Sequence, residues 1–303
     1  MTVAHRPLLV PTRSAYTSDL RDAPCLAHIG RSAVLALHDE LALAPKPGLV
    51  SFVDTGSHRD MDARTFMRSL FALRHAFPAL ANMGAKGASL PALESEGIRA
   101  EAQMLRATGG INTHRGAIFT LGMLCAAAGR CLADRLPLDA ANVRRVLIES
   151  WGRQLACRAA RNTSSHGSHA ARRFGLRGAS LEAADGLPVL FEIVWPSLRA
   201  ALAQGLPPER ARLQALLEAM AVLDDTNLVH RGGLQALYDV RAGARAFLRA
   251  GGAAAPDALD LAWTLHRELV ARHLSPGGSA DLLAAACWLQ RVTSARWPDR
   301  RPS

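Results

Sequence analysis

Residues 24–48 read PCLAHIGRSAVLALHDELALAPKPG, and this stretch indicates the fold of the chain. Its apolar side chains recur at steps of three and four residues, at Leu26, Ile29, Ala33, Leu37 and Leu41. Side chains at this spacing share one face of an α-helix, which can pack against a core. Pro45, Pro47 and Gly48 then end the helix, because proline cannot continue it. The stretch therefore predicts an amphipathic helix followed by a loop.

The same pattern continues along the rest of the chain. Asp62 is a suitable N-cap for a second helix, whose apolar face carries Phe66, Leu70, Leu73 and Phe77. Further apolar stripes, separated by caps or helix breakers, lie at about 90–107, 114–128, 139–160, 181–204, 208–223, 233–250, 257–273 and 280–290. No alternation of apolar and polar residues predicts a strand. We therefore predict an all-α fold, with a single globular domain of about ten helices over residues 24–303 and a loosely ordered N-terminal arm at residues 1–23.

The composition agrees with helices and is consistent with an anionic partner. Hydrophobic residues make up 49% of the 303 residues and aromatic residues only 5%, while alanine and leucine are abundant. This mixture favours helices over sheets. The formal net charge is +10, and the only lysines are Lys46 and Lys86. An anionic ligand is one explanation of this charge, and arginines scattered over solvated helix faces are the other.

The cysteines and the apolar segments bear on the location of the protein. None of the five cysteines forms the two-residue spacing of a redox or zinc motif, which favours a reducing, intracellular environment. The N-terminus lacks the apolar core of a signal peptide, and no stretch approaches the ~20 apolar residues that cross a bilayer. We therefore expect a cytoplasmic protein that does not enter a membrane.

Two segments between predicted helices carry basic side chains suited to phosphate. Lys46 lies between two prolines in a chain that otherwise prefers arginine, which suits a compact charge beside phosphate, although a loop lysine without function is the alternative. His114 and Arg115 follow Asn112 and Thr113 at the start of an apolar helix. Cationic side chains oppose the usual preference for acids at a helix N-terminus, so this departure indicates an anionic ligand.

The segment 224–233 combines acids, an amide and bases within ten residues. The predicted metal ligands are Asp224, Asp225 and Asn227, and the predicted phosphate-binding residues are His230, Arg231 and Gly232. Carboxylate and amide oxygens are the hard ligands that Mg²⁺ takes, and the bases suit phosphates that the same ion would bridge. We predict a site for magnesium and nucleotide phosphate here. An ordinary helix cap rich in Asp and Asn is the alternative.

Two further segments are less specific. Gly277, Gly278 and Ser279 open the last helix, where bare backbone lets a phosphate approach, although an ordinary helix start gives the same pattern. His166 and His169 indicate zinc only weakly, because no His-Glu-x-x-His pattern and no cysteine partner accompany them. The chain contains neither a Walker loop nor a dinucleotide-binding glycine pattern.

Read in order, these stretches resemble the triphosphoribosyl-dephospho-coenzyme A synthase family over about residues 30–290. The matching stretches are Pro45-Lys46-Pro47-Gly48-Leu49-Val50, Asn112-Thr113-His114-Arg115-Gly116-Ala117, Arg177-Gly178, Asp224-Asp225-Thr226-Asn227 with His230-Arg231-Gly232-Gly233, and Gly277-Gly278-Ser279-Ala280-Asp281-Leu282. The resemblance implies an all-helical enzyme that transfers the triphosphoribosyl group of ATP to the ribose 2′-hydroxyl of 3′-dephospho-CoA and releases adenine. It also implies that the product, a prosthetic-group precursor, passes to the enzyme that loads the acyl carrier subunit of malonate decarboxylase or citrate lyase. The freestanding, arginine-rich chain looks more like the malonate decarboxylase branch, with the citrate lyase branch as the alternative.

This reaction requires groups that hold the triphosphate, accept the proton of the hydroxyl and exclude water. For the triphosphate we predict Lys46, His114, Arg115, His230 and Arg231, with Mg²⁺ on Asp224 and Asp225. For the proton we predict Asp60, Glu182 or Asp225, by analogy with the carboxylates that assist glycoside cleavage. Water that reached C1 of the ribose would waste ATP as adenine and ribose triphosphate.

Two other functions fit parts of the sequence. A magnesium-dependent helical hydrolase of nucleotide or ADP-ribosyl substrates would use the same acidic pair. A non-catalytic nucleic-acid-binding protein would explain the charge of +10, but no helix-turn-helix and no aromatic stacking platform is evident. We therefore predict the transferase.

Overall fold

The computed structural model describes residues 22–160, 166–295 and 297. The α-helices are α1 (Ala23–Ala42), α2 (Ala63–Leu73), α3 (Ala76–Ala85), α4 (Leu90–Thr108), α5 (Arg115–Ala133), α6 (Ala140–Leu147), α7 (Arg153–Ala160), α8 (His166–Phe174), α9 (Ala179–Ala184), α10 (Trp195–Ala203), α11 (Pro208–Val222), α12 (Thr226–Arg249), α13 (Ala258–Ala271) and α14 (Gly277–Thr293). Two π-helical turns, η2 (Ile148–Gly152) and η3 (Val189–Val194), lead into α7 and α10, and a 3-10 turn, η4, spans Gly252–Ala254. No strand occurs in the described ranges, and the predicted all-α fold class is confirmed. The predicted arm at residues 1–23 lies outside the described residues except for Asp22 and Ala23.

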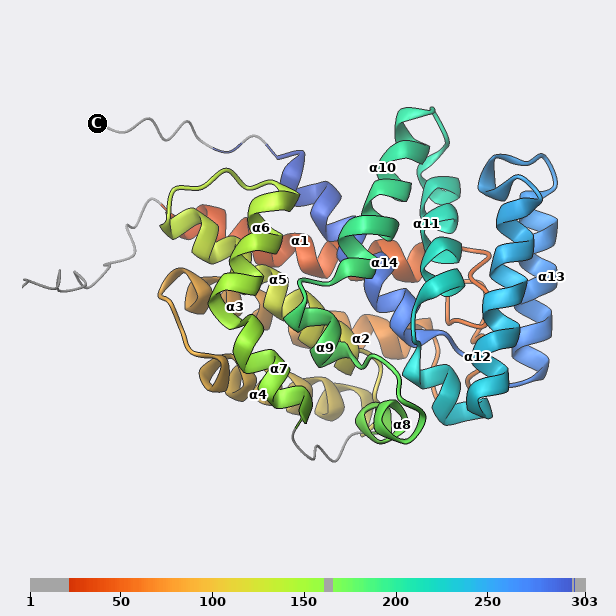
Figure 1. The fold of residues 1–303 in the computed structure, drawn as a ribbon, viewed down its shortest axis with the longest axis horizontal. Helices are drawn as coiled ribbons and strands as arrows, with labels where there is room; N and C mark the ends of the chain where they lie inside the picture. The colour runs from red at the N-terminus through yellow and green to blue at the C-terminus, as the bar shows by residue number, and fades with distance from the viewer. Residues whose placement is uncertain (1–21, 161–165, 296, 298–303) are drawn as a thin grey trace, which may run out of the picture.

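The helix α5 forms the middle of the hydrophobic core. It is buried along most of its length and packs against α3, α4, α6 and α14. The helices α1 and α14 pack along each other through the middle of the molecule, while α10, α11, α12 and α13 stand side by side at one end (Figure 1). All these elements bury apolar faces against one another, so one continuous core supports the whole domain.

Two of the predicted helices were wrong in their extent. The helix expected from Asp62 to Phe77 is divided into α2 and α3, because the chain turns at Arg74 and His75. The helix expected from residue 233 begins at Thr226 instead, and α12 is kinked at Gly233, whose φ is 71°. Apolar periodicity runs across both irregularities, which is why the sequence pattern did not reveal them.

The prediction of one continuous helix at 181–204 was also wrong. It is interrupted after α9, where Gly186 and Leu187 have φ values of 74° and 53°. This left-handed backbone conformation is typical of a helix C-terminus. A further helix, α8, lies in a segment that the apolar periodicity had left between predicted helices.

Among the described helices, α5 is the one whose length and composition would also suit a membrane span. The expectation that no stretch approaches such a span was therefore wrong for Arg115–Ala133. In the structure, 78% of the apolar 18-residue stretch of this helix is buried inside the domain. Because a central core helix is surrounded by apolar side chains, it is apolar on all sides, as a membrane span is. Its place in the core accounts for its composition.

Small residues bring α3 and α5 into close contact. Gly84 lies against the backbone of Ala126, and Gly129 lies against the backbone of Ala81. A Cβ atom on either glycine would overlap a backbone carbonyl oxygen of the other helix. A backbone atom cannot rotate away as a side chain can, so only glycine fits without separating the two helices.

We expect Gly84→Ala and Gly129→Ala each to lower the free energy of unfolding by about 1–3 kcal/mol, because the added methyl group overpacks the contact between α3 and α5. This loss should appear even though alanine gains about 1 kcal/mol of helix propensity over glycine. Gly97→Ala in α4 is the matched control, since no atom lies within 4 Å of its added Cβ, and it should stabilise the protein. Urea unfolding followed by circular dichroism measures all three variants. Equal stabilities of the Gly84→Ala and Gly97→Ala proteins would contradict the packing described.

Candidate functional site

A buried ion pair closes the C-terminal end of α1. The ammonium of Lys46, a residue only 1% exposed, donates to the backbone oxygen of Glu40 at 2.8 Å and lies 2.5 Å from Glu40 Oε1. A cation here also interacts favourably with the partial negative charge of the last carbonyl groups of the helix. The ammonium of Lys46 therefore binds α1 in this structure, and its contact with phosphate stays a prediction.

Burial acts on both members of this pair. It raises the pKa of Glu40 and lowers the pKa of Lys46, because it disfavours both charged forms, while the attraction between the two side chains opposes both shifts. Removing one partner would leave the other charge buried without compensation. The pair is therefore a sensitive point of the structure.

His114 lies close to this ion pair, at the N-cap of α5. Its Nδ1 is 2.6 Å from Ser69 Oγ, and its ring packs edge-on against Phe66 with the ring centroids 4.8 Å apart. Burial, followed by the charge of Lys46, lowers the pKa of His114 to about 3. Its buried Nε2 has no hydrogen-bond partner among the described residues. His114 is therefore a neutral imidazole near pH 7, with one ring nitrogen that a ligand or a water molecule would satisfy.

Asp225 joins the first turns of α12 and α14. Its Oδ1 accepts from the N–H of Asn227 at 3.1 Å, and its Oδ2 accepts from the N–H of Ser279 at 3.0 Å and from the Ser279 hydroxyl at 3.3 Å. The N–H of Gly278 adds a further bond, and these bonds oppose the rise that burial produces in the pKa of Asp225. The carboxylate predicted for metal binding and proton transfer thus caps two helices. The N–H groups of Gly278 and Ser279 that were predicted to bind phosphate are used by this carboxylate.

Asp281 has the same role at the start of α5. Its carboxylate accepts from the N–H of Ala117, and a Cβ atom at Gly116 would overlap its Oδ2. Burial, together with the neighbouring carboxylates of Asp225 and Glu40, raises the pKa of Asp281 well above its ordinary value. The end of α1 and the starts of α5, α12 and α14 therefore meet in one place. We call the charged and polar residues there the buried polar centre: Glu40, Lys46, His114, Asp225 and Asp281.

A polar hollow of about 320 Å³ opens on the surface beside the loop that leads into α14. Its lining residues are Ser57, His58, Arg59, Asp60, Arg231 and His273. His58 Nε2 is 3.0 Å from Ser275 Oγ, and Arg231 Nη2 is 3.3 Å from His58 Nδ1. The carboxylate of Asp60 is 63% exposed and lies 3.6 Å from the same ring nitrogen. Burial, and then the charge of Arg231, lower the pKa of His58 and favour its neutral form. The polar hollow therefore offers a proton acceptor and an anion-binding guanidinium to one ligand.

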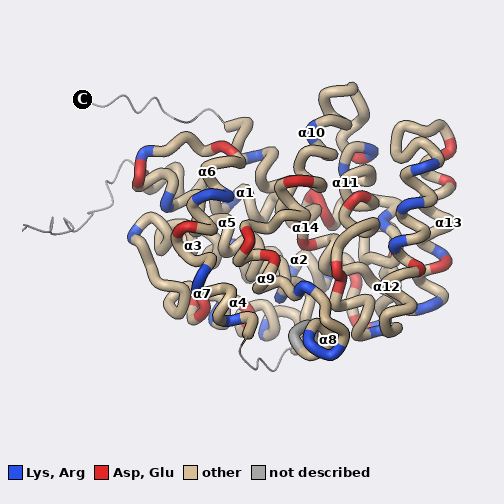
Figure 2. Tube along the Cα trace, in the orientation of Figure 1, with Lys and Arg blue, Asp and Glu red and all other residues tan. Residues whose placement is uncertain are grey.

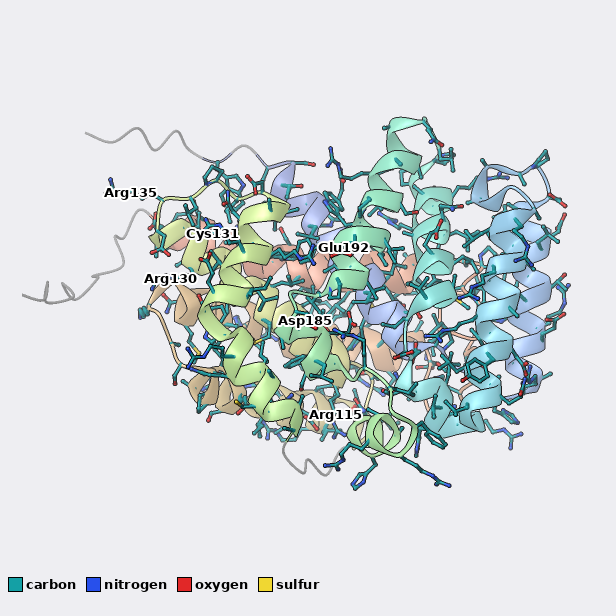
Figure 3. All side chains as sticks on the ribbon, viewed as in Figure 1. Arg115, Arg130, Cys131, Arg135, Asp185 and Glu192 are labelled. Atoms are coloured by element: carbon teal, nitrogen blue, oxygen red, sulfur yellow. The ribbon has the colours of Figure 1, made fainter. Side chains whose placement is uncertain are left out.

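Two of the predicted site residues are paired away from the polar hollow. Arg115, labelled in Figure 3, is exposed and donates from Nε to Glu101 Oε1 at 2.6 Å. Asp224 accepts from Arg241 Nη2 at 2.6 Å and from the N–H of Arg177 at 2.9 Å. The two adjacent acids at the start of α12 therefore bind different partners, and they do not form a ready pair of metal ligands.

Glu182, a predicted proton acceptor, is buried in α9. It accepts from Arg177 Nε at 2.9 Å, and its other oxygen, Oε2, is buried without a hydrogen-bond partner among the described residues. Arg177 also donates to Asp185, which Figure 3 labels. Arg177 therefore holds the carboxylate of Glu182 with its side chain and contacts Asp224 with its backbone N–H.

The other predicted phosphate-binding residues flank the groups described above. His230 and Gly232 are exposed on either side of Arg231. Gly277 lies against Asn227, because an added Cβ at residue 277 would be 2.9 Å from Asn227 Nδ2. The structure thus brings Asp60 and Arg231 together in the polar hollow, whereas it places other predicted residues in the buried polar centre or beside it.

Among the described residues, no group of three or more His, Cys, Asp or Glu side chains is arranged to hold a metal ion. Mg²⁺ commonly takes only one or two protein carboxylates and completes its coordination shell with water and substrate phosphates. The magnesium site therefore stays a prediction. The weak zinc hypothesis gains no ligand set in the described part of the chain.

The sequence did not predict Glu40, Ser69, His58 or Asp281 as site residues. Glu40 and Ser69 lie on predicted helices, where a polar residue is usually taken to face solvent. His58 lies two positions before Asp60, and Asp281 belongs to a stretch that carries the family resemblance. The sequence therefore contained a signal for His58 and Asp281, whereas the burial of Glu40 and Ser69 is visible only in the structure.

Basic residues are not gathered on one face of the molecule in the view of Figure 2, where Lys and Arg are interspersed with Asp and Glu along most helices. Several arginines pair with acids on the surface, among them Arg130 with Asp134 and Arg144 with Glu192. Nucleic-acid binding would favour a continuous basic patch or stripe. The distribution agrees better with arginines on solvated helix faces.

Comparisons with known proteins agree with the sequence resemblance. A family model described as ATP:dephospho-CoA triphosphoribosyl transferase matches residues 26–299. A protein of Acinetobacter calcoaceticus named probable 2-(5''-triphosphoribosyl)-3'-dephosphocoenzyme-A synthase is 39% identical over 257 residues, which cover 85% of this chain and 88% of that protein. Proteins of the same name from Stutzerimonas stutzeri and Vibrio cholerae are 40% and 36% identical, over 91% and 93% of this chain and 95% and 93% of their own lengths. No solved structure matches the chain.

We expect Lys46→Met to lower the free energy of unfolding by roughly 3–5 kcal/mol, because the substitution leaves Glu40 buried without its partner. A second substitution in the same chain, Glu40→Gln, should restore much of this loss, since the remaining amide carries no charge. The control is Lys86→Met, at an exposed lysine, which should change stability by less than about 0.5 kcal/mol. Urea unfolding decides the matter: if Lys46→Met is as stable as Lys86→Met, the ion pair does not support the fold.

The pKa of His114 predicts a dependence of stability on pH. Its folded pKa of about 3 lies below its ordinary value of 6.5, so the unfolded chain binds more protons between these two pH values. The contribution of His114 is therefore complete above pH 6.5 and is lost as the pH falls towards 3. Between pH 7 and pH 5 it should cost about 2 kcal/mol.

His114→Gln removes the titrating group, so the stability of this variant should fall by about 2 kcal/mol less than that of the wild type over the same pH range. His75→Gln, at an exposed histidine, should keep the wild-type dependence. Urea unfolding at pH 5, 6 and 7 measures the three slopes. Identical slopes for the wild type and His114→Gln would show that His114 takes up no proton on unfolding.

Proposed function

The chain belongs to the ATP:dephospho-CoA triphosphoribosyl transferase family, and from this premise we propose the reaction that it performs and the residues that take part. As a triphosphoribosyl-dephospho-CoA synthase, it joins the triphosphoribosyl group of ATP to the ribose 2′-hydroxyl of 3′-dephospho-CoA. The bond between C1 of the transferred ribose and the oxygen of the hydroxyl forms while the bond between C1 and the adenine nitrogen breaks. The hydroxyl gives up its proton, and adenine leaves with a proton.

The meeting of distant segments in the polar hollow is the observation that carries this proposal. Ser57 Oγ donates to Leu274 O at 2.6 Å, and Arg231 Nη1 donates to His273 O at 3.2 Å. With the contact between His58 and Ser275, these bonds join the loop before α2, the start of α12 and the loop before α14. A carboxylate and a neutral imidazole on the loop before α2, with a guanidinium on α12, form the kind of site that a charged nucleotide and an alcohol require.

We assign the triphosphate to Arg231, with His230 and Gly232 beside it. The guanidinium of Arg231 is exposed and lines the polar hollow, so a phosphate can reach it without disturbing the core. In contrast, Lys46 and His114 are buried, and we propose that they act through the buried polar centre that positions α5, α12 and α14. Arg115 would join the phosphate only after leaving Glu101.

Magnesium belongs to the proposal as a partner of the triphosphate. The oxygens of Asp224, Asp225 and Asn227 have the chemistry that Mg²⁺ prefers, and the ion would neutralise phosphate charge there. Asp224 and Asp225 are engaged with Arg241 and Ser279 in this structure, so each would have to exchange a bond to reach a metal. The three residues therefore have suitable ligand atoms for Mg²⁺, but the carboxylates of Asp224 and Asp225 are already hydrogen-bonded within the folded chain.

We propose Asp60 as the acceptor of the hydroxyl proton. Of the three predicted carboxylates, Asp60 alone lines the polar hollow, whereas Asp225 caps two helices and Glu182 is held by Arg177. His58, whose neutral form is favoured, lies between Asp60 and Arg231 and can relay or orient the proton. The exposed carboxylate is thus the one with access to an alcohol substrate.

The use of the product is proposed from the sequence resemblance alone. We favour loading onto the acyl carrier subunit of malonate decarboxylase, in the cytoplasm, after hand-over to the loading enzyme. The citrate lyase carrier is the alternative, and the names of the relatives fit both. The chemical product is the same in both cases, so only the carrier that receives it distinguishes them.

The reaction is tested directly by incubating the protein with ATP, Mg²⁺ and 3′-dephospho-CoA. Mass spectrometry should detect adenine and the coupled product in equal amounts. Ribose triphosphate in place of the coupled product would instead indicate a hydrolase and would overturn the proposal.

In the same assay, Asp60→Asn should lower kcat by about 10²- to 10⁴-fold, the range expected on loss of a general base. Its unfolding free energy should stay at the wild-type value, because the carboxylate is 63% exposed. The contrasting variant is Asp225→Asn, which should lower stability by about 1–3 kcal/mol because the charged cap of α12 and α14 is weakened. Wild-type kcat for Asp60→Asn would remove Asp60 from the reaction.

A further inference from the structure

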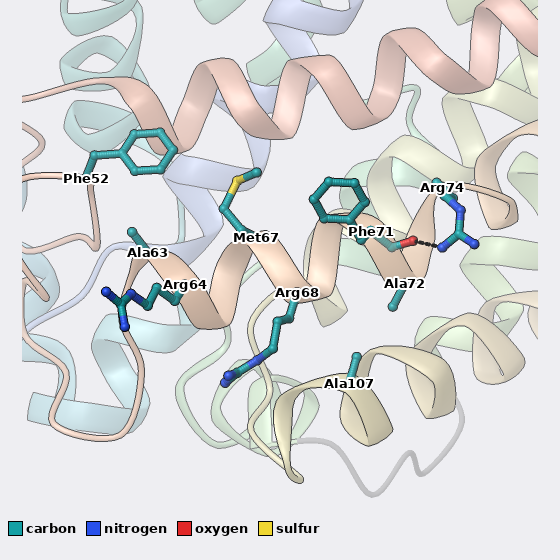
Figure 4. Close-up of a pocket in the computed structure, with 9 residues that line it drawn as sticks. All are labelled: Phe52, Ala63, Arg64, Met67, Arg68, Phe71, Ala72, Arg74 and Ala107. Carbon is teal, nitrogen blue, oxygen red and sulfur yellow. Dashed lines mark hydrogen bonds between the residues drawn. The ribbon is translucent and has the colours of Figure 1, made fainter.

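A groove of about 570 Å³ runs along the outer face of α2 (Figure 4). Its apolar wall includes Phe52, Met67 and Phe71. Phe52 and Phe71 are 51% and 63% exposed, which is unusual for large apolar side chains in a chain with few aromatic residues. We call this feature the α2 groove.

Three arginines line the same groove. In Figure 4, Arg64 and Arg68 extend from one side of α2, whereas Met67 and Phe71 extend from the other. Arg74 donates to the backbone oxygen of Phe71 at 2.6 Å. The α2 groove therefore presents an apolar surface with a row of positive charges along it.

These arginines have not been neutralised by the protein. Among the described residues, none of the three forms a salt bridge with a carboxylate. The acid that interacts electrostatically with Arg64 and Arg68 is Asp62, but its Oδ1 accepts from the N–H and the hydroxyl of Thr65, both at 2.8 Å. The row of charges is thus free to meet an anionic ligand from solution.

The α2 groove and the polar hollow are built on one segment of chain. Phe52 and Arg64 line the groove, while His58 and Asp60, which lie between them in sequence, line the hollow. Arg64 is in the first turn of α2, so it is the groove arginine nearest in sequence to Asp60. The groove and the hollow are therefore joined by a short stretch of chain on both sides of His58 and Asp60.

We propose that the α2 groove binds the diphosphate and pantetheine arm of 3′-dephospho-CoA while its ribose lies in the polar hollow. This inference rests on the proposed transferase reaction, and it assigns the part of the acceptor that does not react. The diphosphate lies at Arg64 and Arg68, and the uncharged arm follows Met67 and Phe71.

The α2 helix is long enough for the diphosphate and for part of the arm, whose far end extends beyond Arg74. From Arg64 to Arg74 the helix rises by about 15 Å. The pantetheine arm has a backbone about as long as four extended amino acid residues, or roughly 14 Å. An anionic group joined to a long uncharged chain also matches the order of charges and apolar side chains along α2.

A second copy of this chain is a poorer occupant of the α2 groove. A two-fold interface places the same surface of both copies together, so the arginines of one copy would approach those of the other. Like charges facing each other oppose such an association. The charge of the groove therefore favours an anionic ligand over self-association.

The test measures equilibrium binding by calorimetry, with 3′-dephospho-CoA and with 4′-phosphopantetheine, which carries the arm but lacks the adenosine. Met67→Ser and Phe71→Ser should each weaken the binding of both compounds by about tenfold, because apolar contact with the arm is lost. Arg68→Gln should weaken both and reduce the salt dependence of binding. Ile98→Ser, at another exposed apolar residue, is the matched control and should bind both as the wild type does.

Steady-state kinetics separates the two substrates. Met67→Ser and Phe71→Ser should raise the KM for 3′-dephospho-CoA about tenfold and leave the KM for ATP unchanged. Wild-type binding of both compounds by these variants would overturn the inference. A change of oligomeric state in size-exclusion chromatography, with binding unaltered, would instead assign the groove to a second copy and overturn it too.

The two proposals fail in different ways. Absence of the coupled product with the wild type contradicts the transferase reaction, while the binding measurement still decides whether the groove holds the arm. Formation of the product together with wild-type binding by Met67→Ser and Phe71→Ser contradicts the groove alone.

Discussion

The structure depends on ionisable groups that close the ends of its helices inside the core. Lys46 binds the last turn of α1, Asp225 caps α12 and α14, and Asp281 caps α5. A buried charge costs several kcal/mol unless it is paired, and a helix end leaves unsatisfied N–H or C=O groups with a partial charge. The buried side chains and the helix ends therefore satisfy each other's unpaired polar groups. Because Asp225 reaches Ser279 across 54 positions in sequence, these contacts hold together segments that apolar packing alone would leave free to shift.

This arrangement limits where a substrate can place its negative charge. A helix N-terminus is normally suited to phosphate, but here the first turns of α5 and α14 already receive carboxylates of the same chain. A phosphate that displaced Asp225 would remove the cap of α12 as well as that of α14. The cationic groups that remain accessible are side chains, with Arg231 in the polar hollow and the arginines of α2 in the α2 groove. Anion recognition is therefore moved from the helix ends to the neighbouring surface.

The sequence was sufficient for the fold class, and it was insufficient for the directions of the side chains in the candidate site. Helical periodicity predicted an all-α chain, and Lys46 was predicted to bind phosphate, whereas in the structure it binds Glu40. Its partner Glu40 lies inside a predicted helix, where nothing in the local pattern distinguishes a buried acid from a solvated one. Likewise, the adjacent acids Asp224 and Asp225 suggested one metal site, but they leave the chain in different directions and bind Arg241 and Ser279. A local sequence pattern gives the spacing of residues along the chain, whereas the partners that side chains find across the fold depend on how the core packs.

A transferase of this kind must bring an alcohol to C1 of a ribose while water is kept away. The polar hollow itself does not exclude water, because Asp60 and Arg231 are exposed to solvent. If the α2 groove holds the arm of the acceptor while its ribose lies in the polar hollow, the acceptor itself covers the hollow, so that the site becomes dry only when the correct alcohol is bound. The part of the acceptor that does not react would then contribute to catalysis as well as to affinity, since it would determine whether ATP loses its ribose to an alcohol or to water. In this arrangement the buried polar centre holds the helices together, the polar hollow carries out the transfer, and the α2 groove selects the acceptor.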